Sequence, residues 1–249
     1  MIVSEDGDRQ LLVTQPDHAH FAAELLSLWR SGGLPAHPRR AELLFAVREH
    51  DNGWRETDSA PHCNPETGRP HDFLSLPRED RIELWRRGVS RYAGERPYAA
   101  LLIVRHALNL HESRRGHEGW EAFLDHLDEL REELLATPDT TGMPAEELEA
   151  DYRWLDLADL LSLTACSRRP AAVERHGFRA VVESAESGEK SAIILRLDPF
   201  PLAGATAFRV PCRRIPARRC RGDADLGGEL AAARWEELAV RVAPFSSAP

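Results

Sequence analysis

Apolar residues recur at the 3.6-residue spacing of helices through most of the first 168 positions of this chain. The most informative helical stretch is residues 41–54, where Leu43, Leu44 and Val47 mark one buried face. One more turn of that face carries His50 and Asp51. Asn52-Gly53 then ends the helix, because glycine tolerates the backbone angles that a helix stop needs.

Five further helices are predicted. The first begins after Thr14, which can cap it with Pro16 in the first turn, and its apolar stripe runs from Phe21 to Trp29. The other four are predicted over residues 78–92, 96–112, 116–136 and 144–167. The stretch from Asn52 to Pro77 has little periodicity and predicts a long ordered loop or lid, a kind of segment that is often functional.

The pattern changes to alternation after Pro170. AVVESA, SAIILRLDPF, TAFRVPC and LAVRVAP are typical of strands separated by turns, and QLLVT near the N-terminus predicts a strand or an extended lead-in. The predicted fold is therefore mainly α, essentially all-α in its core. Residues 1–169 form a helical core, and residues 170–249 form a small antiparallel β-rich element packed on it.

Composition limits the class of function. The net charge of −9 argues against a general nucleic-acid binder. No apolar run is long enough to cross a bilayer and the N-terminus lacks a signal-peptide core, so we expect a cytoplasmic protein. None of the four cysteines forms a C-x-x-C pair, so neither a structural zinc site nor a disulfide is expected.

Metal-competent side chains lie on the buried faces of four predicted helices. They are His18, His50 with Asp51, His106 and Asp159. Nitrogen and carboxylate ligands together suit Fe, Mn, Zn, Ni or Co. A divalent metal held in this way can lower the pKa of a water and polarise a phosphoryl oxygen.

Structural interpretations stay open beside the metal site. His18 could be a core histidine bonded to a carbonyl, and Asp159 could be a buried acid paired with Arg48 or Arg105. For His106, the sequence favours neither interpretation, metal ligand or core histidine, over the other. The whole set could also be a buried hydrogen-bond network without a metal.

Other polar and aromatic residues favour structural roles. His111 lies off the face of His106, and Trp54 is predicted to pack. His71-Asp72 predicts a turn, although Asp72 reaches the site if the loop folds over it. The basic cluster predicts a solvated edge, with phosphate binding as the alternative; it comprises Arg213, Arg214, Arg218, Arg219 and Arg221.

The order His…His-Asp…Asp resembles the HD superfamily of metal-dependent phosphohydrolases. The resemblance implies an HD-like helical bundle in which His18, His50, Asp51 and Asp159 bind the metal. His106 resembles an extra histidine of the subfamilies that hold two metals. The sequence directly after the His50-Asp51 doublet, Asn52-Gly53-Trp54, departs from the sequence context found in many HD enzymes.

A second resemblance covers most of residues 10–168 and the tail. The segments QPDHAHFAAELLSLW, REHDNGWRETDSAP, PETGRPHDF, PYAALLIVRHALNL and DLADLLSLTAC are similar to a bacterial family of unknown function, number 3891 in the domain-of-unknown-function series. That family supplies no known activity.

The expected function is a metal-dependent phosphohydrolase acting on a small-molecule phosphoester, with Asp51 and His106 as its catalytic residues. Asp51 would bridge two metals or orient the attacking water. The alternatives are a metal- or ligand-binding module without turnover and an HD-like di-iron oxygenase. No P-loop is present, so the sequence does not name the substrate, and it does not indicate the oligomeric state.

Overall fold

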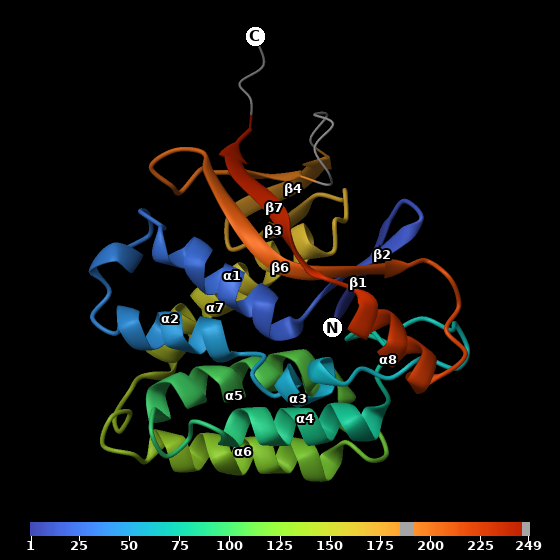
Figure 1. Ribbon diagram of the computed structural model, residues 1–249. Helices are drawn as coiled ribbons and strands as arrows, with labels where there is room; N and C mark the ends of the chain where they lie inside the picture. The colour runs from blue at the N-terminus through green and yellow to red at the C-terminus, as the bar shows by residue number, and fades with distance from the viewer. Residues whose placement is uncertain (185–191, 246–249) are drawn as a thin grey trace.

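A computed structural model describes residues 1–184 and 192–245, and its largest single element is a curled mixed sheet (Figure 1). The seven strands lie in the order β1-β2-β6-β7-β5-β4-β3. Their bounds are β1 Ile2–Asp6, β2 Arg9–Val13, β3 Val173–Arg175, β4 Phe178–Ser184, β5 Ile193–Asp198, β6 Thr206–Pro216 and β7 Trp235–Pro244. The β5–β7 pair is parallel and every other pair is antiparallel.

Helices fill the space beneath the sheet, with α1 and α7 directly against it and α4, α5 and α6 farther away (Figure 1). The helices are α1 Gln15–Ser27, α2 Arg40–Glu49, α3 Trp54–Ser59, α4 Arg78–Ser90, α5 Pro97–His111, α6 Glu121–Leu135, α7 Ala145–Cys166 and α8 Asp223–Ala232. One continuous apolar core joins sheet and helices, from Leu11 in β2 and Val210 in β6 to Leu101 in α5. The sheet is therefore part of the main core.

The predicted helices are confirmed, and local chemistry explains their ends. The Thr14 side chain accepts a hydrogen bond from the Asp17 amide at the start of α1, and Pro16 lies in the first turn. Helix α2 ends at Glu49, with His50 as its C-terminal flanking residue. Among the residues described, no helix is both long and apolar enough to span a membrane.

The prediction of a mainly α, essentially all-α, HD-like bundle with a small β-element is wrong, because the fold is α/β with a large sheet. The strand or extended lead-in predicted at QLLVT is strand β2, whereas strand β1 was not predicted. Strand β1 forms a hairpin with β2 around Gly7, and β2 pairs with β6, placing Arg9 opposite Pro216. Local periodicity does not report a pairing between segments so far apart in the sequence.

The C-terminal region also differs from the purely antiparallel β-element predicted over residues 170–249. Its sheet is mixed, and helix α8 packs Leu226 and Leu230 onto Leu12 and Ile215. The predicted last strand, WEELAVRV, is confirmed as the start of β7. Parts of this predicted element, residues 185–191 and 246–249, lie outside the described residues.

Candidate metal centre

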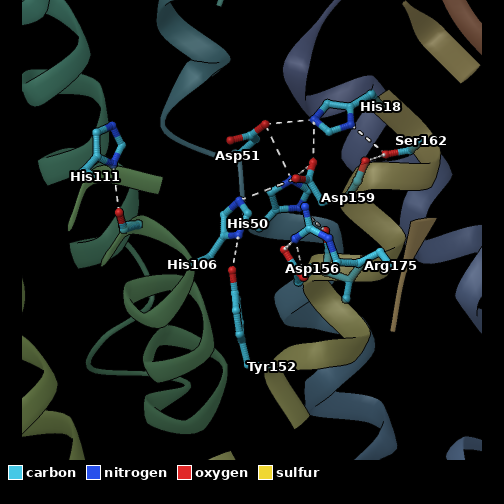
Figure 2. A network of polar contacts seen from close by, with 12 residues as sticks. His18, His50, Asp51, His106, His111, Tyr152, Asp156, Asp159, Ser162 and Arg175 are labelled. Atoms are coloured by element: carbon cyan, nitrogen blue, oxygen red, sulfur yellow. Dashed lines mark hydrogen bonds and ion pairs between the residues drawn. The ribbon is translucent and has the colours of Figure 1, made fainter. Parts of the chain in front are cut away.

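Five buried side chains predicted as metal ligands lie together between the helices, as Figure 2 shows. They are 0–8 % exposed. Two overlapping groups share His50, and within each group the potential ligand atoms all lie within 4.8 Å of one another. The first group is His18, His50 and Asp51, and the second is His50, His106 and Asp159. These His and Asp groups could hold a metal ion.

His50 presents an unpartnered nitrogen to two carboxylates. Its Nδ1 lies 2.7 Å from the Val47 carbonyl oxygen, which can only accept, so we assign the proton to Nδ1. In the neutral ring Nε2 therefore has a bare lone pair. This buried atom has no hydrogen-bond partner and lies 3.3 Å from Asp159 Oδ1 and 3.6 Å from Asp51 Oδ2.

His18 repeats this arrangement. The Ser162 hydroxyl lies 2.9 Å from the Asp159 carbonyl oxygen and donates to it, so it accepts from His18 Nδ1 at 2.8 Å. His18 Nε2 is thereby directed toward Asp51 Oδ2, with which it forms a hydrogen bond of 2.8 Å. A histidine whose second nitrogen donates to an oxygen acceptor is a typical oriented metal ligand.

The charges in the cluster favour a positive charge between its carboxylates and imidazoles. Burial lowers the pKa of His50, but the carboxylates of Asp51 and Asp159 outweigh burial and raise this pKa to about 9. Burial also raises the pKa of each aspartate; His50 and the neighbouring histidines outweigh it and hold both pKa values below the usual range. Both carboxylates are thus ionised, and either a proton or a metal ion must lie between them and the imidazoles.

His106 completes the cluster as a neutral imidazole. Burial lowers its pKa to about 4, so at neutral pH one ring nitrogen keeps a lone pair. Its Nδ1 lies 3.2 Å from the Tyr152 hydroxyl, and its Nε2 lies 3.9 Å from Asp159 Oδ2. His106 can therefore act as a ligand or as a proton acceptor.

The two residues after the doublet fix its position against α4. Asn52 Nδ2 donates to the carbonyl oxygens of Glu49 and Gly88, at 2.8 and 3.0 Å. Gly53 has an ordinary helical φ of −64°, so the expected reason for this glycine, special backbone angles, is wrong. The reason is close approach, because a Cβ there would lie 2.1 Å from the Leu84 carbonyl oxygen.

A cavity of about 170 Å³ opens from the centre to the surface. Asp51, His106 and Asp159 line its inner end, and the partly exposed Leu74 and Leu110 lie at its outer end. The rest of its lining is Gln15, Trp54, Phe73, Arg81, Trp85, His111 and Leu163. Larger cavities, of about 310, 360, 490 and 600 Å³, are lined by none of the five predicted ligands.

The structure decides between several alternatives. Arg105 pairs with Glu149 at 2.9 Å and Arg48 lies 3.8 Å from Glu49, so Asp159 faces histidines instead of either arginine. His71-Asp72 forms the predicted turn, in which Asp72 Oδ1 accepts from two following backbone amides. Phe73 and Leu74, directly after this turn, reach the cavity.

The basic cluster lies in β6 and just before α8, and three of its five arginines form ion pairs. Arg214 pairs with Asp6 at 2.7 Å and with Glu236 at 2.8 Å. Arg218 and Arg221 both face Asp225. These ion pairs favour the structural interpretation over a phosphate-binding groove.

Sequence reasoning missed the residues that orient the predicted ligands. Ser162 and Tyr152 contact the Nδ1 atoms of His18 and His106, but both look like ordinary members of the buried stripe of α7. Their spacing to Asp159, three residues after it and seven before it, was the available signal.

A model of the family described as "Protein of unknown function (DUF3891)" matches residues 1–217. The chain therefore belongs to the DUF3891 family. No curated protein and no solved structure matches it. The likeness to the HD superfamily consequently depends on the arrangement of the His and Asp residues.

Proposed function

We propose that this protein is a cytoplasmic metal-dependent hydrolase of small-molecule phosphoesters. One observation carries the proposal: the buried His50 Nε2 has no hydrogen-bond partner and lies within 3.6 Å of carboxylate oxygens from both Asp51 and Asp159. A divalent Fe, Mn, Zn, Ni or Co ion bound there would supply Lewis-acid polarisation of a phosphoryl oxygen and a water of lowered pKa.

The residues of the cluster fit such an ion. His18 and His50 each present an oriented Nε2, and Asp51 and Asp159 each present an ionised oxygen. This set of four nitrogen and oxygen donors matches the preference of borderline divalent metals. Asp51 also lines the cavity, where its carboxylate can orient a water.

Two further side chains support an anionic substrate. Arg81 lines the cavity, and its guanidinium is anchored by donating to the carbonyl oxygens of Leu74 and Leu76, at 2.8 and 3.0 Å. Its positive charge favours a phosphoryl group approaching the centre. His106, neutral at pH 7, is placed to take a proton or steady that group. The net charge of −9 supports a small substrate over nucleic acid.

The test compares metal content and phosphatase activity in wild type and Asp51→Asn. Chelator-treated protein is reloaded with Mn, Fe, Zn, Ni or Co and assayed on 4-nitrophenyl phosphate and a panel of phosphoesters. Wild type should bind metal and cleave a phosphoester. At about 100 times the Kd, metal should add about 2.7 kcal/mol to the free energy of unfolding. Asp51→Asn, similar in size but uncharged, should lose both properties and keep its circular dichroism spectrum.

Asp151→Asn is the matched control. Asp151 is equally buried and pairs with His37 at 2.7 Å, away from the centre, so this variant should keep metal and activity. Metal binding without cleavage of any phosphoester would overturn the hydrolase and leave a binding module. If wild type binds no metal, the cluster is a buried polar network.

The cavity walls favour one second candidate, a metal-dependent oxygenase. Trp54, Phe73, Trp85, Leu110 and Leu163 make much of the lining apolar, which suits an organic substrate attacked by oxygen. Oxygen consumption by the Fe(II)-loaded protein in the presence of an organic substrate, without phosphoester cleavage, would favour this candidate.

A further inference from the structure

A separate cavity of about 310 Å³ lies where strands β2, β6 and β7 meet helices α1, α3 and α8. Its volume is within the roughly 300–1,000 Å³ of pockets that bind small organic ligands. None of the described residues lines both this cavity and the cavity at the metal centre. A ligand bound here would therefore occupy a site of its own.

Arg213 supplies this cavity with a positive charge. Its guanidinium carbon lies 4.2 Å from the centroid of the Trp235 ring, and its Nη1 makes one long hydrogen bond, of 3.5 Å, to the Leu230 carbonyl oxygen. Arg213, Trp235 and Leu230 all line the cavity, so the guanidinium lies at the cavity wall. In the part of the chain that the structure describes, no carboxylate forms an ion pair with Arg213, and its Nη2 is neither bonded nor buried.

The other charged side chains of the wall are satisfied within the protein. Their partners are Glu49 for Arg55, the Met1 amino group and the Gln15 amide for Asp58, and the Thr14 hydroxyl for Asp17. Arg213 is thus the lining charge that still lacks an opposite charge among the described residues. A guanidinium presents planar N–H donors that match the oxygens of an anion, so charge complementarity indicates an anionic group at Arg213.

The rest of the wall favours an organic body on that anion. Leu12 and Leu230 are 3 % and 8 % exposed, and Pro16 also lines the cavity. Trp235 is 56 % exposed, although its ring is one of the largest apolar surfaces in the chain. An inorganic ion would leave these apolar surfaces in contact with water, whereas a hydrocarbon chain would cover them.

We propose that this cavity binds a small organic monocarboxylate. Its carboxylate would accept hydrogen bonds from the Arg213 guanidinium, and its hydrocarbon part would lie against Leu12 and Leu230. Asp17 and Asp58 add negative charge to the same wall, so a monoanion is favoured over a dianion such as a phosphate monoester. The proposal is independent of the metal centre and of the proposed function.

The test measures binding to the full chain by calorimetry. Octanoate carries both the charge and the chain, octanamide keeps the chain without the charge, and acetate keeps the charge without the chain. Octanoate should bind with a Kd of roughly 1 mM or tighter. Octanamide and acetate should each bind at least about tenfold more weakly. Octyl phosphate, the dianion, should also bind more weakly than octanoate.

Arg213→Gln removes the charge at the wall. It should weaken octanoate about tenfold and leave octanamide unchanged, while Arg213→Lys should retain part of the affinity. The matched control is Arg219→Gln. Arg219 also has no ion pair among the described residues, but it donates to the Glu66 carbonyl oxygen and does not line the cavity. This control should bind octanoate as wild type does.

Equal binding of octanoate and octanamide by wild type, or equal effects of Arg213→Gln and Arg219→Gln, would overturn the proposal. Tighter binding of octyl phosphate than of octanoate would overturn the choice of a monocarboxylate. If Arg213→Gln does not fold, Trp235→Ala at the exposed side of the stack makes the same test, because it removes the ring that holds the guanidinium. That variant should weaken octanoate several-fold, and unchanged affinity would contradict the site.

Discussion

The Nδ1 atom of His18 lies 2.8 Å from the Ser162 hydroxyl, which connects α1 to α7 inside the core. Ser162 is fully buried and also donates to the carbonyl oxygen of Asp159, so its single proton is already committed. The hydroxyl therefore acts only as an acceptor toward His18. This fixes the ring so that Nε2 is directed at Asp51.

Ser162→Ala should weaken metal binding 10- to 100-fold, the typical cost of removing a residue that orients a metal ligand. The ligands themselves stay intact, so weakened binding would show that orientation matters. Titration of a divalent metal into chelator-treated protein measures the change. Thr164→Val is the control, because Thr164 makes a similar hydroxyl bond to a helix carbonyl without touching a ligand. Equal affinities for both variants would contradict the role of Ser162.

The predicted ligands could be found from the sequence because their chemistry coincides with a simple pattern. Asp159 lies four residues from both Leu155 and Leu163, so helical register alone places it on a buried face. The orienting residues could not be found in this way. In the sequence, Ser162 looks like an ordinary small packing residue. The tautomer that it imposes on His18 exists only once α1 and α7 are in contact.

The sheet was underestimated for a similar reason. The helices are specified by local periodicity, whereas β2 gains its place by pairing Leu12 with Arg213, far along the chain. Helix α8 was missed because Gly227 and Gly228 lower its intrinsic propensity, and Leu226 and Leu230 are stabilised by burial beneath the sheet edge. Tertiary contacts therefore determine the place of β2 in the sheet and the formation of α8.

His111 should make stability depend on pH. Burial lowers its pKa from 6.5 to about 4; its bond to the Ala107 carbonyl oxygen opposes this, and the charges of Arg81 and Arg114 reinforce it. The folded state thus favours neutral histidine. The resulting stability is fully present above pH 6.5 and is lost as the pH falls toward 4, a difference of up to about 3 kcal/mol.

His111→Gln should flatten this dependence, because glutamine does not titrate. Urea unfolding between pH 7 and pH 4 measures the slope. Part of the pH dependence of the free energy of unfolding should persist in this variant, since burial also lowers the pKa of His106 to about 4. The exposed His117 provides the control, and a His117→Gln profile as flat as that of His111→Gln would contradict the assignment.

Gly53→Ala should destabilise the protein although the native backbone angles suit alanine. The added Cβ would lie 2.1 Å from the Leu84 carbonyl oxygen, and a backbone atom of a packed helix cannot turn aside. Moving α4 should cost about 3 kcal/mol, lowering Tm by roughly 6–12 °C. Gly94→Ala, which meets nothing within 4 Å, should change stability by less than about 0.5 kcal/mol. Equal melting temperatures for the two variants would show that α4 yields freely and that Gly53 does not hold Asp51 in place.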